Sequence, residues 1–169
     1  MPLSFVLILS RLSADNYTLM FSRYYEAGLR CNIKRQSAFE AEIAASAEGY
    51  LSRNLDGLHC MTAGKNDIRV TFQRLGQLVV FVGGTDEMDE IALADVVACV
   101  RGLILALVGL RGGEGDSDKD QKSGLGESDL LNPSVYGNFS LAVDELVAGD
   151  GHLDSTDIES LLLRSKLKV

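Results

Sequence analysis

The sequence predicts an α/β (α+β) protein built on a five-stranded antiparallel sheet with helices on both faces. Two short runs, residues 5–9 and 78–82, are apolar at every position, which is typical of strands that are covered on both faces. Three other strand patterns lie between them, and four segments show helical character. The order of these elements along the chain is ββαβββααα, with room for one domain in 169 residues.

The strand predictions rest on apolar patterning and turn residues. The expected strands are residues 5–9, 18–25, 58–62, 68–73 and 78–82. Asp15-Asn16 is a turn signal that makes the first two strands a hairpin. Residues 68–73 alternate between apolar and polar types, which predicts one wetter face. Because the first and fifth strands are apolar on both faces, they belong in the middle, and the predicted strand order is 2-1-5-4-3.

The helix predictions rest on periodicity and capping. The expected helices are residues 37–53, 86–110, 135–147 and a short last one, capped by Ser155 or Thr156, that ends at Leu163. The first should lie on one face of the sheet, and the second and third on the other. The second is apolar nearly all round from Val96, so other elements or a partner should cover it. Asp95 and Arg101 interrupt it, which favours a buried helix over a membrane span.

The domain is expected to span residues 1–169, with a flexible Gly/Asp-rich loop at 111–130. The net charge is −8, and no basic stripe is visible, which argues against nucleic acid and against unaided binding to anionic membranes. Cys31, Cys60 and Cys99 are far apart and lack metal-site spacing. They are expected to be reduced thiols of a cytosolic protein, packed as small apolar side chains.

The sequence offers no catalytic constellation. His59 and His152 have no nucleophile near them in sequence, and no nucleotide-binding or nucleophile-elbow motif occurs, so no enzyme and no cofactor are expected. Residues 116–127 place acidic side chains at four ligand positions of an EF-hand loop. Gln121 occupies the position that needs glycine, so a solvated acidic loop is favoured and no metal site is expected.

Three local strings resemble one protein family. They are Arg23-Tyr24-Tyr25, Ala38-Phe39-Glu40 with Ile43, and residues 141–147 with the Gly-rich exit that ends at Ser155. Together with the element order they resemble the longin-like (SNARE-like) small subunits of clathrin adaptors (sigma) and of coatomer (zeta). The resemblance implies a non-enzymatic subunit of a vesicle coat or adaptor complex. Its partners would be large and medium subunits, and it would reach membranes only indirectly, through the complex.

The resemblance also suggests contact residues and a departure from the family. Tyr24, Tyr25, Asp144 and Glu145 are the expected partner interface. Sigma subunits that read acidic dileucine signals carry an arginine where this chain has Met20, so such signals are not expected to bind. A divergent zeta and the small subunit of a TSET (TPLATE-type) adaptor both remain open. The alternative is a longin-type subunit of a small-GTPase regulatory or tethering complex.

Overall fold

One antiparallel sheet of five strands forms the centre of the molecule. The computed structural model describes residues 2–53, 57–85, 88–111 and 125–167. The strands are β1 (Leu3–Ser13), β2 (Asn16–Tyr24), β3 (His59–Ala63), β4 (Ile68–Leu75) and β5 (Leu78–Gly84). Their order is β2-β1-β5-β4-β3, as predicted, with the two fully apolar strands in the middle.

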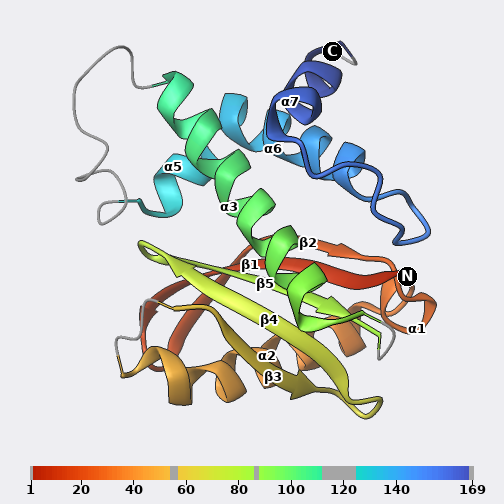
Figure 1. Ribbon diagram of the computed structural model, residues 1–169. Helices are drawn as coiled ribbons and strands as arrows, with labels where there is room; N and C mark the ends of the chain where they lie inside the picture. Colours follow the sequence, from red (N-terminus) through yellow and green to blue (C-terminus); the bar gives the residue numbers. More distant parts are fainter. Residues whose placement is uncertain (1, 54–56, 86–87, 112–124, 168–169) are drawn as a thin grey trace.

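The helices lie on both faces of this sheet (Figure 1). They are α1 (Ala27–Arg30), α2 (Ile33–Leu51), α3 (Glu90–Arg111), α5 (Glu127–Leu131), α6 (Pro133–Leu146) and α7 (Ile158–Leu167). The α2 helix covers one face, and α3, α5, α6 and α7 gather on the other. This placement confirms the predicted distribution of the long helices.

The central strands contribute to two separate apolar cores, because successive side chains of a strand point to opposite faces. Val6 and Ile8 of β1 belong to the core under α3 and α6. Phe5 and Leu7 belong to the core under α2. The side chains of β5 divide in the same way. Since each fully buried Leu or Phe contributes about 1.5–3 kcal/mol, both cores stabilise the sheet.

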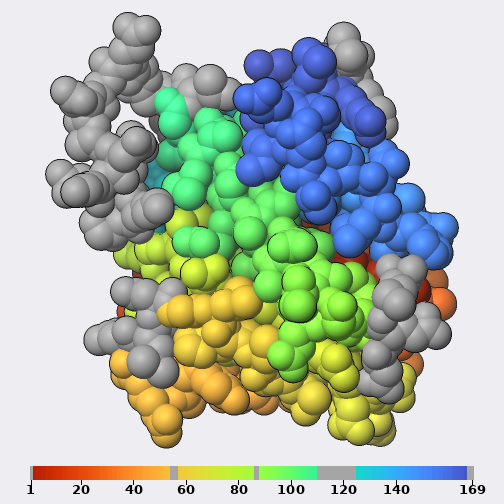
Figure 2. Space-filling view, in the orientation of Figure 1, coloured from red at the N-terminus to blue at the C-terminus, as the bar shows by residue number. Residues whose placement is uncertain are grey.

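Neighbouring elements bury one side of the α3 helix. Val96, Val100 and Leu103 are fully buried against neighbouring elements. A Cβ added at Gly102 would lie 2.3 Å from Ile158 Cδ1, so α7 packs directly on α3. In the space-filling view the two helices form one continuous surface (Figure 2). By length and composition alone residues 90–109 could cross a membrane, and 44% of the most apolar window in this segment is buried inside the fold.

Part of the predicted loop at 111–130 is helical, which corrects that prediction. Residues 127–131 form α5, and Leu125 and Leu130 are buried in the core under α3. The backbone N–H of Gln77 donates to the carbonyl of Leu125 at 2.9 Å, so the β4–β5 turn contacts the chain here. Residues 112–124, and with them most of the acidic EF-hand-like string, lie outside the described residues.

Helix ends and turns account for the other differences from prediction. The Asn32 side chain accepts a hydrogen bond from Arg35 N at 3.2 Å, so α2 begins at Ile33 and not at residue 37. The Asp157 carboxylate accepts from Ser160 N at 3.3 Å, so Asp157 caps α7 in place of Ser155 or Thr156. The four-residue α1 was not expected.

Burial of single side chains confirms one prediction and corrects another. The face of β4 that carries Arg69 and Gln73 is the wetter one, as predicted, since both are half-buried, although Thr71 between them is fully buried under α3. Of the three cysteines, Cys99 is buried as expected, whereas Cys31 is exposed. Burial raises the pKa of the Cys99 thiol to about 11, so this group is neutral near pH 7.

Candidate partner-binding surface

The end of β2 and the last turn of α6 meet at the surface, although they are far apart in sequence. The Nε of Arg23 donates to the Asp144 carboxylate at 3.1 Å, and its Nη2 donates to the Ser140 hydroxyl. The guanidinium carbon also lies 4.8 Å from the centre of the Phe21 ring. Two of the strings that carry the family resemblance therefore contact each other directly, which gives both a structural role.

Tyr24 points to the opposite face of the sheet. Only 9% of the residue is exposed, and its hydroxyl donates to Glu40 Oε1 at 2.7 Å. Burial, and then the hydrogen bond to Glu40, raise the pKa of this phenol. The side chain joins β2 to α2, so most of it belongs to the core.

Tyr25 lies on the α6 side, next to Asp144. Its ring packs against the core under α3 and α6, and within the described residues its hydroxyl is buried and has no hydrogen-bond partner. Burial is the main cause that raises the pKa of this phenol, and the negative charge of Asp144 adds to it. A buried hydroxyl without a partner costs about 1–3 kcal/mol, so a group that donated or accepted here would remove a penalty.

A hollow of about 290 Å³ brings most of the predicted contact residues together. Tyr24, Tyr25 and Asp144 line it, together with Arg23 and Arg30. Glu145 does not line it, because adjacent helical residues diverge by about 100°. The arginine of α1 donates weakly to the carbonyl of Gly149, at 3.4 Å. Nothing in the sequence pointed to this arginine, since α1 is too short to show periodicity.

Of the two histidines considered for catalysis, His59 packs against aromatic rings and His152 lies on the surface. The His59 ring lies 5.2 Å from the Tyr50 ring and 5.4 Å from the Phe72 ring, between centroids. His152 Nδ1 lies 3.0 Å from the Asp150 carboxylate on an exposed loop. No cluster of three His, Cys, Asp or Glu side chains suited to a metal ion occurs in the described part of the chain.

Comparison with known structures identifies the fold of the protein. A chain in a homology model of the full-length AP-3 complex, in a stretched open conformation, superposes with a TM-score of 0.61. The match covers 98% of this chain and 92% of that one at 13% identity, so it concerns the fold alone. The fold is thus the longin-like α+β fold of adaptor-complex subunits, as the sequence predicted.

A curated protein is similar to this chain in sequence. No protein-family model matches the chain. Among curated proteins it is similar to the TSET complex member tstD of Dictyostelium discoideum, with 29% identity over 154 residues. The match covers 91% of this chain and 88% of the relative. The resemblance to a sigma-like adaptor small subunit is therefore confirmed, and TSET is the adaptor to which this relative belongs.

Proposed function

We propose that this protein is a non-enzymatic structural subunit of a vesicle adaptor complex, of the TSET type, that acts in membrane trafficking. The observation that carries the proposal is its likeness to tstD over 91% of the chain. The protein would bury surface against a large helical-solenoid subunit and assemble with a medium subunit as a hetero-oligomer. It would lie in the cytoplasm, peripheral to coated membranes and bound to them only through the complex.

The charge of the chain supports an indirect route to membranes. A net charge of −8 repels anionic phospholipid headgroups, and binding to them requires clustered Lys or Arg. Partner subunits would therefore supply the membrane contact. The same charge disfavours nucleic acid as a partner.

We place part of the partner interface at the exposed end of α6. Asp144 is exposed and lines the hollow beside Tyr25, and its neighbour Glu145 is half-buried on the adjoining surface of α6. A neutral hydrogen-bonding group of the partner would enter this hollow and reach the buried Tyr25 hydroxyl. Tyr24 would contribute indirectly, because its hydroxyl donates to Glu40 and so holds β2 against α2.

Dileucine sorting signals are not expected to be ligands. Met20, which stands where sigma subunits that read such signals carry arginine, is only 6% exposed and packs in the core under α6. A buried thioether offers no positive charge to an acidic signal. Binding of an acidic dileucine peptide to the purified complex would contradict this part of the proposal.

The experiment that tests the function is purification of the tagged full-length chain from its own cells, followed by mass spectrometry. We expect large and medium adaptor-type subunits in near-stoichiometric amounts. Recovery of a small GTPase or a tethering complex without a solenoid subunit would instead support a longin-type regulatory subunit, and would overturn the proposal.

A pair of variants tests the surface. Charge reversal at both Asp144→Arg and Glu145→Arg should reduce recovery of the large subunit at least fivefold. Asp95→Arg, at an exposed carboxylate on α3, is the matched control and should leave recovery unchanged. Circular dichroism would verify that each variant is folded. Equal recovery with both would show that this end of α6 is not the contact.

A further inference from the structure

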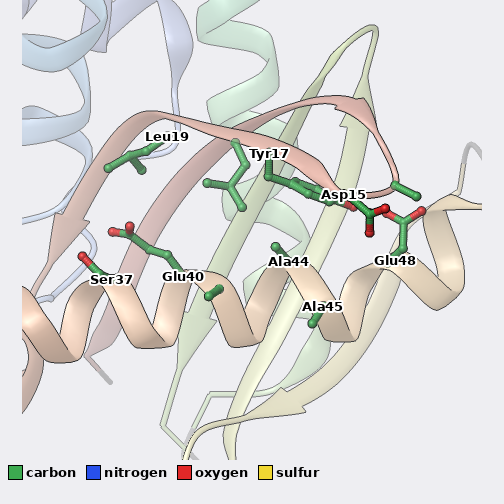
Figure 3. Close-up of a pocket in the computed structure, with 11 residues that line it drawn as sticks. Asp15, Tyr17, Leu19, Ser37, Glu40, Ala44, Ala45 and Glu48 are labelled. Carbon is green, nitrogen blue, oxygen red and sulfur yellow. The ribbon is translucent and has the colours of Figure 1, made fainter.

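A larger hollow lies elsewhere, between α2 and the β1–β2 hairpin (Figure 3). Its volume is about 590 Å³, within the range of about 300–1,000 Å³ typical of binding clefts. The side chains that α2 contributes to its lining include three short ones, Ala41, Ala44 and Ala45, which leave space beside the hairpin. Leu19 of β2 stands above them and is 45% exposed, although its neighbours in the strand pairing are buried.

The hollow runs beside a free strand edge. Within the described residues β2 pairs with β1 alone and is the last strand of the sheet on that side. Its first residues, Asn16, Thr18 and Leu19, are exposed. The outer N–H and C=O groups of such a strand can pair with an added strand, which is a common mode of peptide recognition.

The lining of the hollow is negatively charged. It contains Asp15, Glu40 and Glu48 and no Lys or Arg. Glu48 is neutralised by Arg11, whose Nη2 lies 2.6 Å from Glu48 Oε1. Glu40 accepts only the neutral Tyr24 hydroxyl, and no ion pair to Asp15 or Glu40 is found in the described part of the chain. Figure 3 shows Glu40 towards one end of the hollow and Asp15 at the other.

We propose that this groove binds an extended segment of a partner polypeptide, which adds as a strand to the edge of β2. The segment would place an apolar side chain against Leu19 and the alanines, and a Lys or Arg at Asp15 or Glu40. The twelve helical residues from Ser37 to Glu48 span about 16 Å, the length of about five residues of extended chain. The proposal does not depend on the adaptor assignment, because the groove is defined by this chain alone.

Charge distinguishes this occupant from two others. An acidic segment would bring like charges against Asp15 and Glu40. A second copy of this chain, joined edge to edge through β2, would bring two acidic grooves together in a protein whose net charge is already −8. Both arrangements are repulsive. A segment with alternating apolar and basic residues can pair with the edge of β2, pack on the alanines of α2 and complement the charges of Asp15 and Glu40.

The test is selection of a displayed library of random eight-residue peptides on the full-length chain. We expect the selected peptides to alternate apolar residues with Lys or Arg, and to slow amide exchange over residues 16–19. Ala41→Phe fills the groove and should weaken their binding at least tenfold. Ala38→Phe, an exposed alanine on the same helix that does not line the groove, is the matched control and should change binding less than twofold.

Several results would overturn the proposal. These are the absence of enriched peptides, enrichment of acidic ones, equal binding to the Ala41→Phe variant, and a dimer in sedimentation that the Ala41→Phe variant abolishes. Raising the salt concentration should weaken binding of the selected peptides, since their charges meet exposed carboxylates. Peptide selection can succeed when purification recovers no adaptor subunits, so the two proposals fail separately.

Discussion

The two faces of the sheet are closed by different interactions. Under α3 and α6 the contacts are mainly between apolar groups, as where the Phe139 and Phe21 rings meet edge to face at 4.9 Å between centroids. On the other face α2 is the one long helix, with Leu29 of the short α1 beside it, and tyrosines join the border of α2 to the sheet through carboxylates, Tyr24 to Glu40 and Tyr17 to Glu48. Where several helices share a face, packing alone fills the space. Where one long helix does so, hydrogen bonds complete the closure and a groove remains.

The largest loss of stability should come from a substitution in the core under α3 and α6. Phe139→Ala removes a fully buried ring and should lower the free energy of unfolding by about 3–5 kcal/mol, because a cavity replaces the contact with Phe21. Denaturant titration followed by circular dichroism measures this loss. Leu163→Ala, at a side chain that is 62% exposed on α7, should cost less than about 0.5 kcal/mol. Similar losses for the two variants would mean that this face is not the main source of stability.

The loop that joins α6 to α7 offers a comparison between two glycines. Gly151 has φ 88°, and an added Cβ would lie 2.5 Å from the Leu3 carbonyl oxygen, so Gly151→Ala should cost about 1–3 kcal/mol. Gly149 has open space around its Cα, and Gly149→Ala should be nearly neutral. The difference in thermal midpoint between the two variants measures the cost. A neutral Gly151→Ala would show that the attachment of this loop to β1 is dispensable.

The face under α2 should depend on pH through Glu48. The two hydrogen bonds from Arg11, at 2.6 and 2.9 Å, are the main cause that lowers the pKa of Glu48. A carboxyl whose pKa is lower in the folded state stabilises the fold above its unfolded pKa of about 4.3, and loses this contribution as pH falls through the folded value. Glu48→Gln should therefore cost about 1–2 kcal/mol at pH 7.

The pH dependence distinguishes the two faces. The difference in unfolding free energy between wild type and Glu48→Gln should shrink as pH is lowered from 6 to 3. The deficit of Phe139→Ala should change little over that interval, because no titrating group is lost. Asp95→Asn, at an exposed carboxylate, serves as the control for added amide groups. A difference for Glu48→Gln that is constant with pH would contradict the role given to its charge.

The smallest loss of stability should come from breaking the exposed ion pair between Arg23 of β2 and Asp144 of α6. The Arg23–Asp144 pair is exposed, at 36% and 49% of the two side chains, so its coupling energy should lie below about 1 kcal/mol. A double-mutant cycle with Arg23→Ala and Asp144→Ala measures it, and added salt should reduce it further. A larger coupling would mean that the contact between the two strings does more than align β2 with α6.

The sequence was sufficient for the sheet because its signals are local. The runs at 5–9 and 78–82 are apolar on both faces, which places β1 and β5 in the centre and fixes the order of the other strands. The short helices were missed for the opposite reason. The α1 helix has four residues, and α5 lies in a Gly/Asp-rich context, so neither shows a period.

Side-chain pairs could be predicted only in part. The strings at residues 23–25 and 141–147 were singled out separately, but the contact between Arg23 and Asp144 needs the packed fold. The groove beside α2 was not predicted at all. Its floor is made by alanines that read as ordinary helix formers, and only the position of the edge strand turns them into a cleft.

The start of β1 contacts a late part of the chain, since Leu3 N donates to the Gly151 carbonyl at 2.7 Å. This arrangement has a consequence for synthesis on the ribosome. The first strand made is a central one, and its neighbour β5 is complete at Gly84. The helix α6, which covers part of their shared apolar face, ends at Leu146. At about 5–20 residues per second, the roughly 60 residues between these points take several seconds to appear. During that interval the nascent sheet exposes the part of this face that α6 covers, which chaperones or a co-translationally assembling subunit can occupy.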